Sequence, residues 1–463
     1  MRRLRVLLLN PPGDKVYIRD YYCSKVSKAN YTYEPLDLLL LSGILSQRHE
    51  VLAIDAIASK LTETECLARI VDYKPDATIF ITGSVSYKTD FEFLKKIKSA
   101  HNTLLIGSGD IFMEDQIKQL QENTAIDAIL LDFTDPSILE YLDGRYDSDN
   151  IISRKQGQVI QGRIIRRHGE EFHIPQPRHE LFPLSRYNYP FVREKKFATV
   201  LTDYGCPYKC TFCIMSQIGH KMRLVEDVIQ ELRGIKAQGI TEVYFDDQTF
   251  AANKKRTFKL LERMIEERLD IGWCCFSRVD VLDEGLIRRM KAAGCHTIMF
   301  GVESGNEAIL NAHNKGITKS KVIEAFRLCR RYGITTVATF IIGLPEETHE
   351  TAEETVKFSL ESGCDYASYN VAVPRMGTIL RENAIRDKLI DSTVYEMDQS
   401  GSKAILKTRG LTISEVERLK NQAIKRFYFR YSFLLKELFR IKTLYDITSR
   451  VNGFYGVMRN MLG

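Results

Sequence analysis

The chain repeats one pattern twice: short apolar stretches alternate with segments that have the apolar period of a helix. The first run covers residues 1 to about 145, and the second begins at Phe197. Strands that alternate with helices favour parallel sheets whose faces are covered by helices. The sequence therefore predicts an α/β protein with two parallel sheets, each built from strand–helix units.

The first run predicts a doubly wound, Rossmann-like sheet. Its helices are expected at residues 36–47, 61–73 and 90–99, and its strands at residues 5–9, 51–55, 77–82, 103–106 and 126–131. In such sheets, ligands bind beyond the carboxyl ends of the strands. The first place to look for a ligand site is therefore the set of loops that follow these strands.

Those loops carry small or turn-forming residues, namely Asn10, Pro11, Ser84, Gly107, Ser108 and Gly109. Glycine lets a ligand approach the backbone closely, so three such loops together predict a ligand site. The alternative is that they are only tight turns between strands and helices. The order Gly-Ser-Gly-Asp at residues 107–110 differs from G-x-G-x-x-G, so we expect no nicotinamide cofactor.

The second run predicts a partial (β/α)6 barrel, in which the chemistry lies at the carboxyl ends of the strands. Its strands are expected at residues 197–202, 241–246, 271–276, 296–302, 334–342 and 366–373. The chain then divides into a Rossmann-like domain at 1–145, a proline-containing linker at 146–190, the barrel at 191–400 and a helical segment at 401–463.

Cys206, Cys210 and Cys213 form a C-x3-C-x2-C motif directly after the first strand of the second run. A [4Fe–4S] cluster takes four thiolates, so three cysteines leave one iron without a protein ligand. An open metal position is where a small molecule binds and reacts. A structural zinc ion would need further ligands, and no second cysteine pair follows at a suitable distance. A disulfide is disfavoured because the ten cysteines show no paired framework.

Further motifs follow the cysteines in order along the chain. They are Tyr-Phe-Asp-Asp at 244–247, Phe-Gly-Val-Glu-Ser-Gly at 300–305, Ile-Gly-Leu-Pro-Glu at 342–346 and Pro-Arg-Met-Gly-Thr at 374–378. With Cys206-Pro-Tyr-Lys-Cys-Thr-Phe-Cys213, residues 197–378 resemble the radical S-adenosylmethionine (SAM) superfamily. Met376 stands where the family usually has proline.

This resemblance implies a radical enzyme in which the open iron chelates SAM and one electron releases a 5′-deoxyadenosyl radical. The family motifs place cofactor-binding residues near the methionine end of SAM, its polar groups and its adenine. Tyr244, Asp246 and Asp247 are expected near the methionine end of SAM. Glu303 and Ser304 are expected near its polar groups, and Ile342, Gly343 and Leu344 near its adenine. The two aspartates are equally explained as helix caps. Arg278 ends a strand, where it meets either a carboxylate of the ligand or a structural ion-pair partner.

The N-terminal run has a narrower resemblance, to the cobalamin-binding domain that is fused to many members. The similarity lies in Asn10-Pro-Pro12, Pro35-Leu36 and residues 51–55, 83–86 and 107–109. Several positions depart from the pattern of that domain. Asp37 stands where the family usually has glycine, Asp110 replaces the usual proline or histidine neighbourhood, and Asp132-Phe-Thr-Asp135 replaces a Gly-Glu-Gly-Glu-like turn. Neither His49 nor His101 has the sequence setting of a histidine ligand to cobalt. A substrate-binding or vestigial domain is the alternative.

The two resemblances imply methylation of an unactivated carbon through a 5′-deoxyadenosyl radical, with a [4Fe–4S] cluster, SAM and cobalamin as cofactors. The expected partners are a small-molecule or lipid-like substrate and an external one-electron reductant of the flavodoxin or ferredoxin type. A rearrangement, cyclisation or oxidation without net methyl transfer is the alternative. A non-catalytic electron carrier or cofactor-binding protein is a third possibility, which an open iron disfavours.

The net charge of +6 resides in the C-terminal tail. Residues 415–463 contain ten Lys or Arg and four acids, so the rest of the chain is neutral overall. This tail is also rich in aromatics, which suits peripheral membrane contact or a helical cap on the barrel, whereas nucleic-acid binding is not expected. The N-terminal apolar run is too short for a signal peptide and no stretch reaches membrane-spanning length, so we expect a cytoplasmic protein.

Overall fold

The computed structural model describes residues 2–431 and 433–435. Its N-terminal half is built on a seven-stranded sheet in the order β4-β1-β5-β6-β7-β8-β9. The strands are β1 (Arg5–Asn10), β4 (Glu50–Asp55), β5 (Ala77–Ile81), β6 (Leu104–Ser108), β7 (Ala128–Leu130), β8 (Ile151–Lys155) and β9 (Gln158–Gln161). The accompanying helices are α1 (Leu36–Ser46), α2 (Glu63–Tyr73), α3 (Tyr87–Ala100), α4 (Gln116–Glu122) and α5 (Ser137–Leu142).

The strands from β4 to β7 are parallel and have the doubly wound order. Counted along the chain, they follow the sequence 2-1-3-4-5, whose switch point lies between β1 and β5. The strand cores are continuous apolar runs because both faces of a parallel sheet are covered; Val6 to Leu9, for example, are fully buried. The prediction of a doubly wound α/β sheet is confirmed.

The region expected to be a linker, residues 146–190, is partly built into the sheets. Strands β8 and β9 extend the first sheet as an antiparallel hairpin, whose turn residues Gln156 and Gly157 both have positive φ, at 48° and 82°. Strand β10 (His168–Phe172) pairs with β13 (His220–Arg223). The prolines that suggested a linker all lie at residues 175–190, after these strands, so they do not interrupt them.

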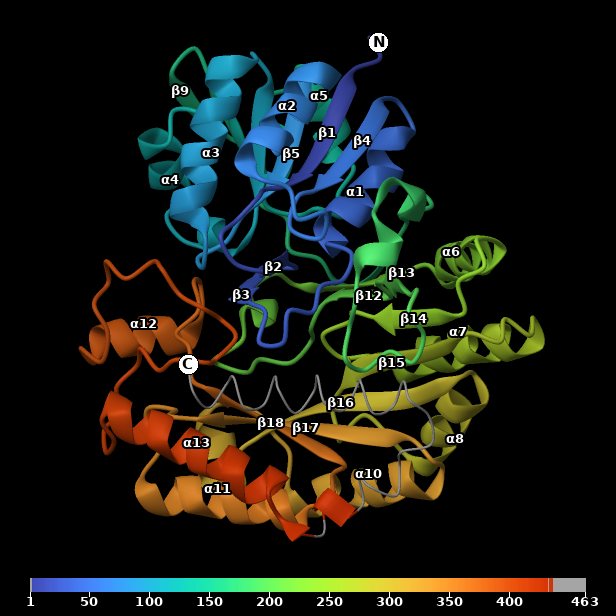
Figure 1. Cartoon of the computed structure of the whole chain (residues 1–463), viewed down its shortest axis with the longest axis vertical. Coiled ribbons are helices and arrows are strands. Elements are labelled where there is room, and N and C mark those ends of the chain that lie inside the picture. Colours follow the sequence, from blue (N-terminus) through green and yellow to red (C-terminus); the bar gives the residue numbers. More distant parts are fainter. Residues whose placement is uncertain (1, 432, 436–463) are drawn as a thin grey trace.

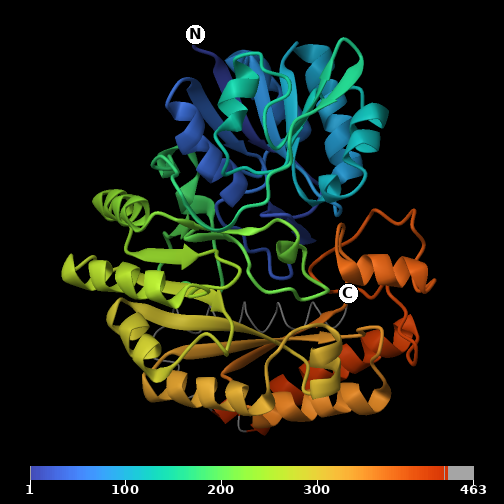
Figure 2. The same ribbon diagram turned by 180° about the vertical axis from the view of Figure 1, so that it is seen from behind.

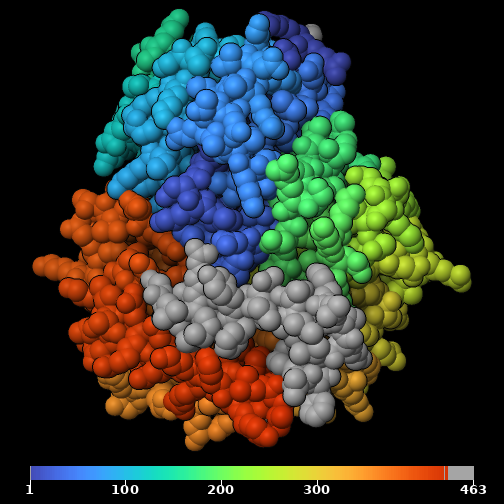
Figure 3. Space-filling view, in the orientation of Figure 1, coloured from blue at the N-terminus to red at the C-terminus, as the bar shows by residue number. Residues whose placement is uncertain are grey.

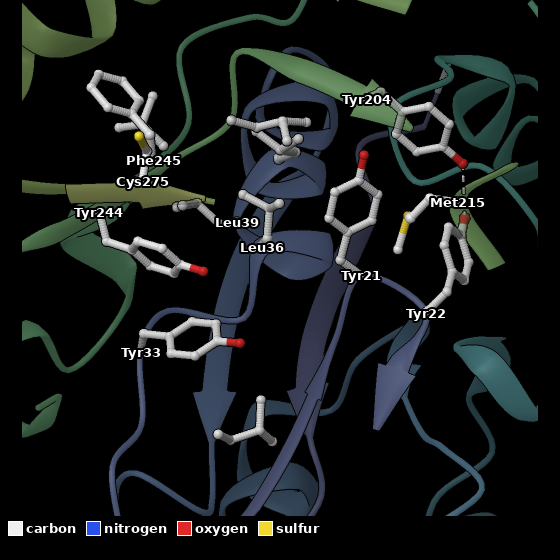
Figure 4. Packing of buried hydrophobic residues seen from close by; sticks show 14 of the residues in the cluster. Tyr21, Tyr22, Tyr33, Leu36, Leu39, Tyr204, Met215, Tyr244, Phe245 and Cys275 are labelled. Atoms are coloured by element: carbon white, nitrogen blue, oxygen red, sulfur yellow. Dashed lines mark hydrogen bonds between the residues drawn. The ribbon is translucent and has the colours of Figure 1, made fainter. Parts of the chain in front are cut away.

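A short hairpin that the sequence did not predict lies between the two halves of the molecule (Figure 1). It consists of β2 (Tyr17–Asp20) and β3 (Cys23–Val26), joined by Tyr21 and Tyr22 with φ values of 47° and 55°. Tyr21 lies against Tyr204 with ring centroids 5.6 Å apart, and Tyr204 donates a 3.3 Å hydrogen bond to Tyr22 (Figure 4). This hairpin joins the two sheets through buried aromatic side chains.

The C-terminal half is built on a six-stranded parallel sheet in the sequential order β11-β14-β15-β16-β17-β18. The strands are β11 (Ala198–Val200), β14 (Glu242–Phe245), β15 (Gly272–Ser277), β16 (Cys295–Glu303), β17 (Thr335–Ile342) and β18 (Tyr366–Val371). The helices are α6 (Val225–Ala237), α7 (Lys254–Glu266), α8 (Glu284–Ala292), α9 (Glu307–Ala312), α10 (Lys319–Arg331), α11 (His349–Glu361) and α12 (Ile379–Arg386). Six sequential strand–helix units match the number and order that the sequence predicts.

Both views show a middle layer between the N-terminal half and the second sheet, with α10 and α11 on the far side of that sheet (Figures 1 and 2). A small sheet of β10, β13 and β12 (Asp203–Gly205) lies in that middle layer. Residues 381–399 cross to the N-terminal half, where Arg381 pairs with Glu114 at 2.8 Å and Tyr395 donates to Asp115 at 3.0 Å (Figure 3).

The first part of the basic, aromatic tail is a cap on the second sheet. Helix α13 (Ile413–Tyr428) buries Val416, Ala423 and Phe427, and the Tyr428 hydroxyl donates to the Ala367 carbonyl of β18 at 2.6 Å. Residues 436–463, on which most of the predicted membrane contact depends, lie outside the described residues. Within the part of the chain that is described, no helix is long and apolar enough to cross a membrane.

Candidate active site

The loop that carries the three cysteines, residues 206–213, leaves β12 at the carboxyl edge of the second sheet. Gly205 starts it with φ at +74°, where a Cβ atom would lie 1.9 Å from the Gly219 carbonyl oxygen, so only glycine fits. The Gly205 amide also donates to the Tyr21 hydroxyl of the β2–β3 hairpin. The loop is therefore held by both the hairpin and its own sheet.

The thiols of this cysteine loop lie among cations. The Arg278 guanidinium donates to Cys210 Sγ at 3.7 Å, and Cys206 Sγ lies 3.5 Å from Thr249 Oγ1. Burial raises the pKa of Cys213 to about 12, and the positive charge of Arg375 opposes this effect. Burial also raises the pKa of Cys210, and the positive charges of Lys315 and Arg278 partly offset this rise. Such thiols become thiolates when a metal stabilises the charged form.

The three thiols suit a cluster better than a single ion. Nowhere in residues 2–431 or 433–435 do three His, Cys, Asp or Glu side chains converge where one metal ion would be held. In a [4Fe–4S] cluster the cysteine thiolates bind different irons, so they need not meet at one point. The donor set and its cationic surroundings thus fit an iron–sulfur cluster.

A hydrogen-bonded chain behind the cysteine loop was not anticipated from the sequence. Thr211, between Cys210 and Cys213, has its hydroxyl 2.6 Å from His313 Nδ1, and His313 Nε2 lies 2.9 Å from Glu346. The Thr211 amide donates to the His313 carbonyl at 3.2 Å. His313 follows α9 and had no motif around it, so only the three-dimensional structure reveals its place.

The acidic residues at the end of β14 have different surroundings. Asp246 accepts a 2.5 Å hydrogen bond from Tyr244, and its carboxyl group also shares a hydrogen bond with the carboxyl group of Asp20. Burial, and then the neighbouring carboxylate of Asp20, raise the pKa of Asp246 well above its usual range. Asp247 instead accepts from the amides of Thr202 and Asp203, which fixes the strand that leads to the cysteine loop.

Glu303 ends β16 in a strained conformation, with φ at +70°. Its carboxylate pairs with Lys315 at 3.0 Å, and Lys315 also supplies the carbonyl that accepts from Arg278 at 2.6 Å. Ser304 is 3.0 Å from Thr355 and is satisfied inside the fold. Arg278 is held by Asp280 at 2.9 Å and stacks over the Tyr208 ring at 3.8 Å, so its structural contacts are extensive.

The residues expected beside adenine are buried. Ile342 and Leu344 are 0% and 1% exposed, and the Gly343 amide donates to Glu347. They lie at the end of β17, on the same edge of the sheet as the cysteine loop, but their side chains pack inward.

The crevice at the switch point of the N-terminal sheet is largely occupied by the chain itself, which leaves a small cavity beside Asn10, Arg19 and Asp55. Arg19 of β2, 2% exposed, donates to Asn10 at 2.9 Å, to the Pro11 carbonyl at 3.0 Å and to Asp90 at 2.6 Å. Asn10 also donates to Asp55 at 3.0 Å. Asn10 and Pro11, predicted to face a ligand, thus hold the hairpin.

The other two loops of this edge are also occupied from within. Ser84 donates to Asp110 at 2.6 Å, and Asp110 accepts a second hydrogen bond from Ser24 of β3 at 3.1 Å. Gly107 and Gly109 accommodate protein rather than open space, because added Cβ atoms would lie 2.7 Å from Phe112 and 1.8 Å from Thr82. Of the predicted N-terminal residues, only Ser108 has a buried hydroxyl without a described hydrogen-bond partner.

Comparisons with known proteins show the family of the chain. A family model described as the radical SAM superfamily matches residues 200–359. An uncharacterized methyltransferase of Pyrococcus horikoshii is 31% identical over 454 residues, 95% of each chain. The anaerobic magnesium-protoporphyrin IX monomethyl ester cyclase of Rubrivivax gelatinosus is 25% identical, over 90% of this chain and 78% of its own.

Two solved structures share the fold over most of this chain. The radical SAM methyltransferase TsrM of Kitasatospora setae, with cobalamin and a [4Fe–4S] cluster bound, has a TM-score of 0.69 at 16% identity and covers 92% of this chain and 89% of its own. The cobalamin-dependent S-adenosylmethionine radical enzyme OxsB has a TM-score of 0.70 at 16% identity, and the match covers 99% of this chain and 72% of the OxsB chain. The family match, the full-length relative and the shared fold lead to one conclusion: the chain belongs to the radical SAM superfamily of enzymes.

Proposed function

We propose that this enzyme methylates an unactivated carbon of a small molecule by radical chemistry, in a reducing, low-oxygen cytoplasm. The observation that carries the proposal is the cysteine loop, which carries three thiols within electrostatic range of one another at the carboxyl edge of the six-stranded sheet, beside Arg278, Lys315 and Arg375. The full-length relative in Pyrococcus is named a methyltransferase, and tryptophan 2-C-methyltransferase and hopanoid C-2 methylase are more distant relatives.

Cys206, Cys210 and Cys213 would hold the cluster, and SAM would lie between them and the neighbouring strand ends. When bound, these two cofactors supply the electron and the 5′-deoxyadenosyl radical that removes a hydrogen atom from the substrate. The strained Glu303 is the acceptor best placed for the ammonium and hydroxyl groups of SAM, and Asp246, whose carboxyl group shares a hydrogen bond with Asp20, is the second candidate. Arg278 and Asp247 act through the cysteine loop, since their own bonds are made inside the protein.

Cobalamin is the proposed methyl carrier, supported by the fold shared with two cobalamin-binding enzymes. The residues predicted to hold it bind Arg19, Asp55 and Asp110 instead, so the N-terminal edge as it stands does not provide the fit. Cobalamin would have to displace the β2–β3 hairpin or bind on its other side. We therefore derive no step through it.

A reaction without net methyl transfer is the second candidate, and the largely occupied switch point favours it. A rearrangement, cyclisation or oxidation needs the radical but no methyl carrier, and the Rubrivivax relative is named a cyclase. In either case an external one-electron donor of the flavodoxin or ferredoxin type has to reduce the cluster.

One experiment separates the two candidates. The protein is reconstituted anaerobically with iron and sulfide, with and without hydroxocobalamin, and then given a reductant, trideuteromethyl-labelled SAM and an extract of small metabolites. Methyl transfer predicts 5′-deoxyadenosine together with S-adenosylhomocysteine and a product heavier by one labelled methyl group, the last two dependent on cobalamin. 5′-Deoxyadenosine alone, equal with and without cobalamin, would support the second candidate and exclude methylation.

A further inference from the structure

Two lysines from distant segments meet at the carboxyl end of β18. Lys28, just after the β2–β3 hairpin, donates from Nζ to Asn370 Oδ1 at 2.7 Å. Lys420 of α13 donates from Nζ to the Ser402 carbonyl at 2.5 Å. The Val371 amide donates to the Gly401 carbonyl at 2.9 Å, so the turn that binds Lys420 lies beside the strand end that binds Lys28.

Neither ammonium group has a carboxylate partner. The buried cations elsewhere in the described chain each have a carboxylate oxygen at 3.1 Å or less; they are Arg19, Lys221, Arg223, Arg256, Arg278, Lys315 and Arg381. No described carboxylate lies within salt-bridge distance of Lys28 or Lys420, although Lys420 is only 4% exposed. Lys420 is thus the exception among the buried cations of the described chain, and its neighbour Lys28, which is partly exposed, likewise has no carboxylate at salt-bridge distance.

The acids nearby are engaged elsewhere. Asp398 accepts from the amides of Val26 at 3.0 Å and Ser400 at 2.9 Å, and Glu417 accepts from the Ala404 amide at 3.1 Å. Each lysine ammonium has three N–H donors, of which one is used by the bonds described above. The remaining donors have no described acceptor.

The surroundings of the two lysines disfavour the charged form of both ammonium groups. Burial, and then the charge of Lys420, lower the pKa of Lys28 to about 7. Burial also lowers the pKa of Lys420, only partly offset by Glu417. Two like charges withdrawn from water repel each other, and an anion between them would remove that cost.

The pair lies on the reacting side of the molecule. Asn370 ends β18 on the same edge of the sheet as the cysteine loop, and Arg375, a few residues further along the chain, has Cys213 and Glu303 among its charged neighbours. In sheets of this kind, substrates bind at that edge. An anion held by Lys28 and Lys420 would therefore belong to a molecule that reaches the radical site.

We propose that Lys28 and Lys420 bind an anionic group, a carboxylate or a phosphate, of the substrate. This assignment rests on the proposed function, because it takes the edge with the cysteine loop as the place of reaction. It names the class of substrate: a small molecule with an acidic group at a distance from the carbon that reacts.

Binding of simple anions tests the proposal without knowledge of the substrate. The full-length protein with its cluster reconstituted is titrated with acetate and with phosphate at constant ionic strength set by chloride, and binding is followed by calorimetry and thermal unfolding. Wild type should bind at least one probe and gain thermal stability. Lys28→Met and Lys420→Met should each weaken that binding by about 10-fold or more, the factor that corresponds to ~1.4 kcal/mol. Tighter binding of acetate would assign a carboxylate to the substrate, and tighter binding of phosphate would assign a phosphate.

Lys88→Met is the matched control, because Lys88 is an exposed lysine paired with Glu396. It should bind both probes as wild type does. Failure of wild type to bind either probe, or equal binding by all three variants, would overturn the proposal. So would loss of anion binding in the presence of S-adenosylhomocysteine, which would assign the lysines to the cofactor carboxylate.

The test is independent of the proposed function. Formation of 5′-deoxyadenosine, measured on the same samples, reports on the radical reaction alone. Anion binding that persists in a protein unable to cleave SAM would contradict the proposed function and leave the lysine site intact.

Discussion

At the scale of single residues, the reactive site is defined by a few side chains whose surroundings are unusual. Glu303 keeps a positive φ that few residues other than glycine adopt, and its carboxylate has Lys315 as partner. Backbone strain of this kind persists only when the surrounding fold imposes it, and it gathers at binding sites. The strain and the ion pair together fix the direction of the Glu303 carboxylate.

Glu303→Gln should weaken SAM binding and leave the cluster in place. The amide keeps a hydrogen-bonding oxygen but loses the charge that would attract the SAM ammonium, so we expect the SAM dissociation constant to rise by about 10-fold, equivalent to ~1.4 kcal/mol. Equilibrium dialysis with labelled SAM measures this, and iron content reports on the cluster. Glu307→Gln, at an exposed position of α9, is the control. Unchanged SAM affinity in Glu303→Gln would remove Glu303 from the site.

Some of these residues are accessible to sequence reasoning and others are not. Cys206, Cys210 and Cys213 stand in one short motif, so their proximity follows from the chain itself. His313, Lys315 and Lys420 stand in no motif, and they reach the site only through the folding of segments far apart in the sequence. For Asp247 the sequence shows an acid at a strand end but not that its oxygens are taken by the amides of Thr202 and Asp203.

At the scale of elements, the β2–β3 hairpin decides what the N-terminal sheet can do. The strands and helices of both sheets were predictable because their apolar period is strong. The hairpin was not, because Tyr17 to Val26 contains four polar or charged residues and a turn of two tyrosines rather than glycine or asparagine. Its stability comes from tertiary partners such as Asp90, Asp37 and Gly205.

Arg19→Met should destabilise the N-terminal half strongly. It would leave Asp90 buried without its cationic partner, and removal of one member of a buried ion pair typically costs about 3–5 kcal/mol. Urea unfolding followed by circular dichroism measures the loss. Arg5→Met is the control, because Arg5 pairs with Glu50 on the surface and its loss should change stability by no more than about 0.5 kcal/mol. Equal stability of the two variants would refute the role of Arg19.

At the scale of the whole molecule, a buried histidine links the two halves. His179 Nδ1 lies 2.8 Å from Glu34, just before α1, and its Nε2 lies 2.9 Å from Glu231 of α6. Burial opposes the charged form, but the carboxylates of Glu34 and Glu231 outweigh it and raise the pKa of His179 to about 10. The ion triad therefore holds the sheets together while the imidazole is protonated.

The stability of the molecule should fall as pH rises from about 7 to about 10. Because the folded pKa of His179 lies above its ordinary value of 6.5, its contribution is complete below that value and is lost as pH passes the folded pKa. His179→Gln should lower stability near pH 7 by about 3–5 kcal/mol and by much less above pH 10. Denaturant titrations across this range measure the difference from wild type.

His173→Gln is the control for that experiment, since His173 contacts Asp227 at the surface with 61% of its side chain exposed. Its stability should follow the wild-type pH profile. A constant difference between wild type and His179→Gln at all pH values would contradict the raised pKa of His179.

The central claim is that the cysteine loop holds a cluster at which SAM is cleaved to a radical. The most direct test is the yield of 5′-deoxyadenosine from anaerobically reconstituted protein given dithionite and SAM, compared between wild type, Cys210→Ala and the buried, distant control Cys66→Ala. We predict 5′-deoxyadenosine from wild type and Cys66→Ala, and neither product nor a full complement of iron from Cys210→Ala. Undiminished product from Cys210→Ala, or none from wild type with a complete cluster, would contradict the account.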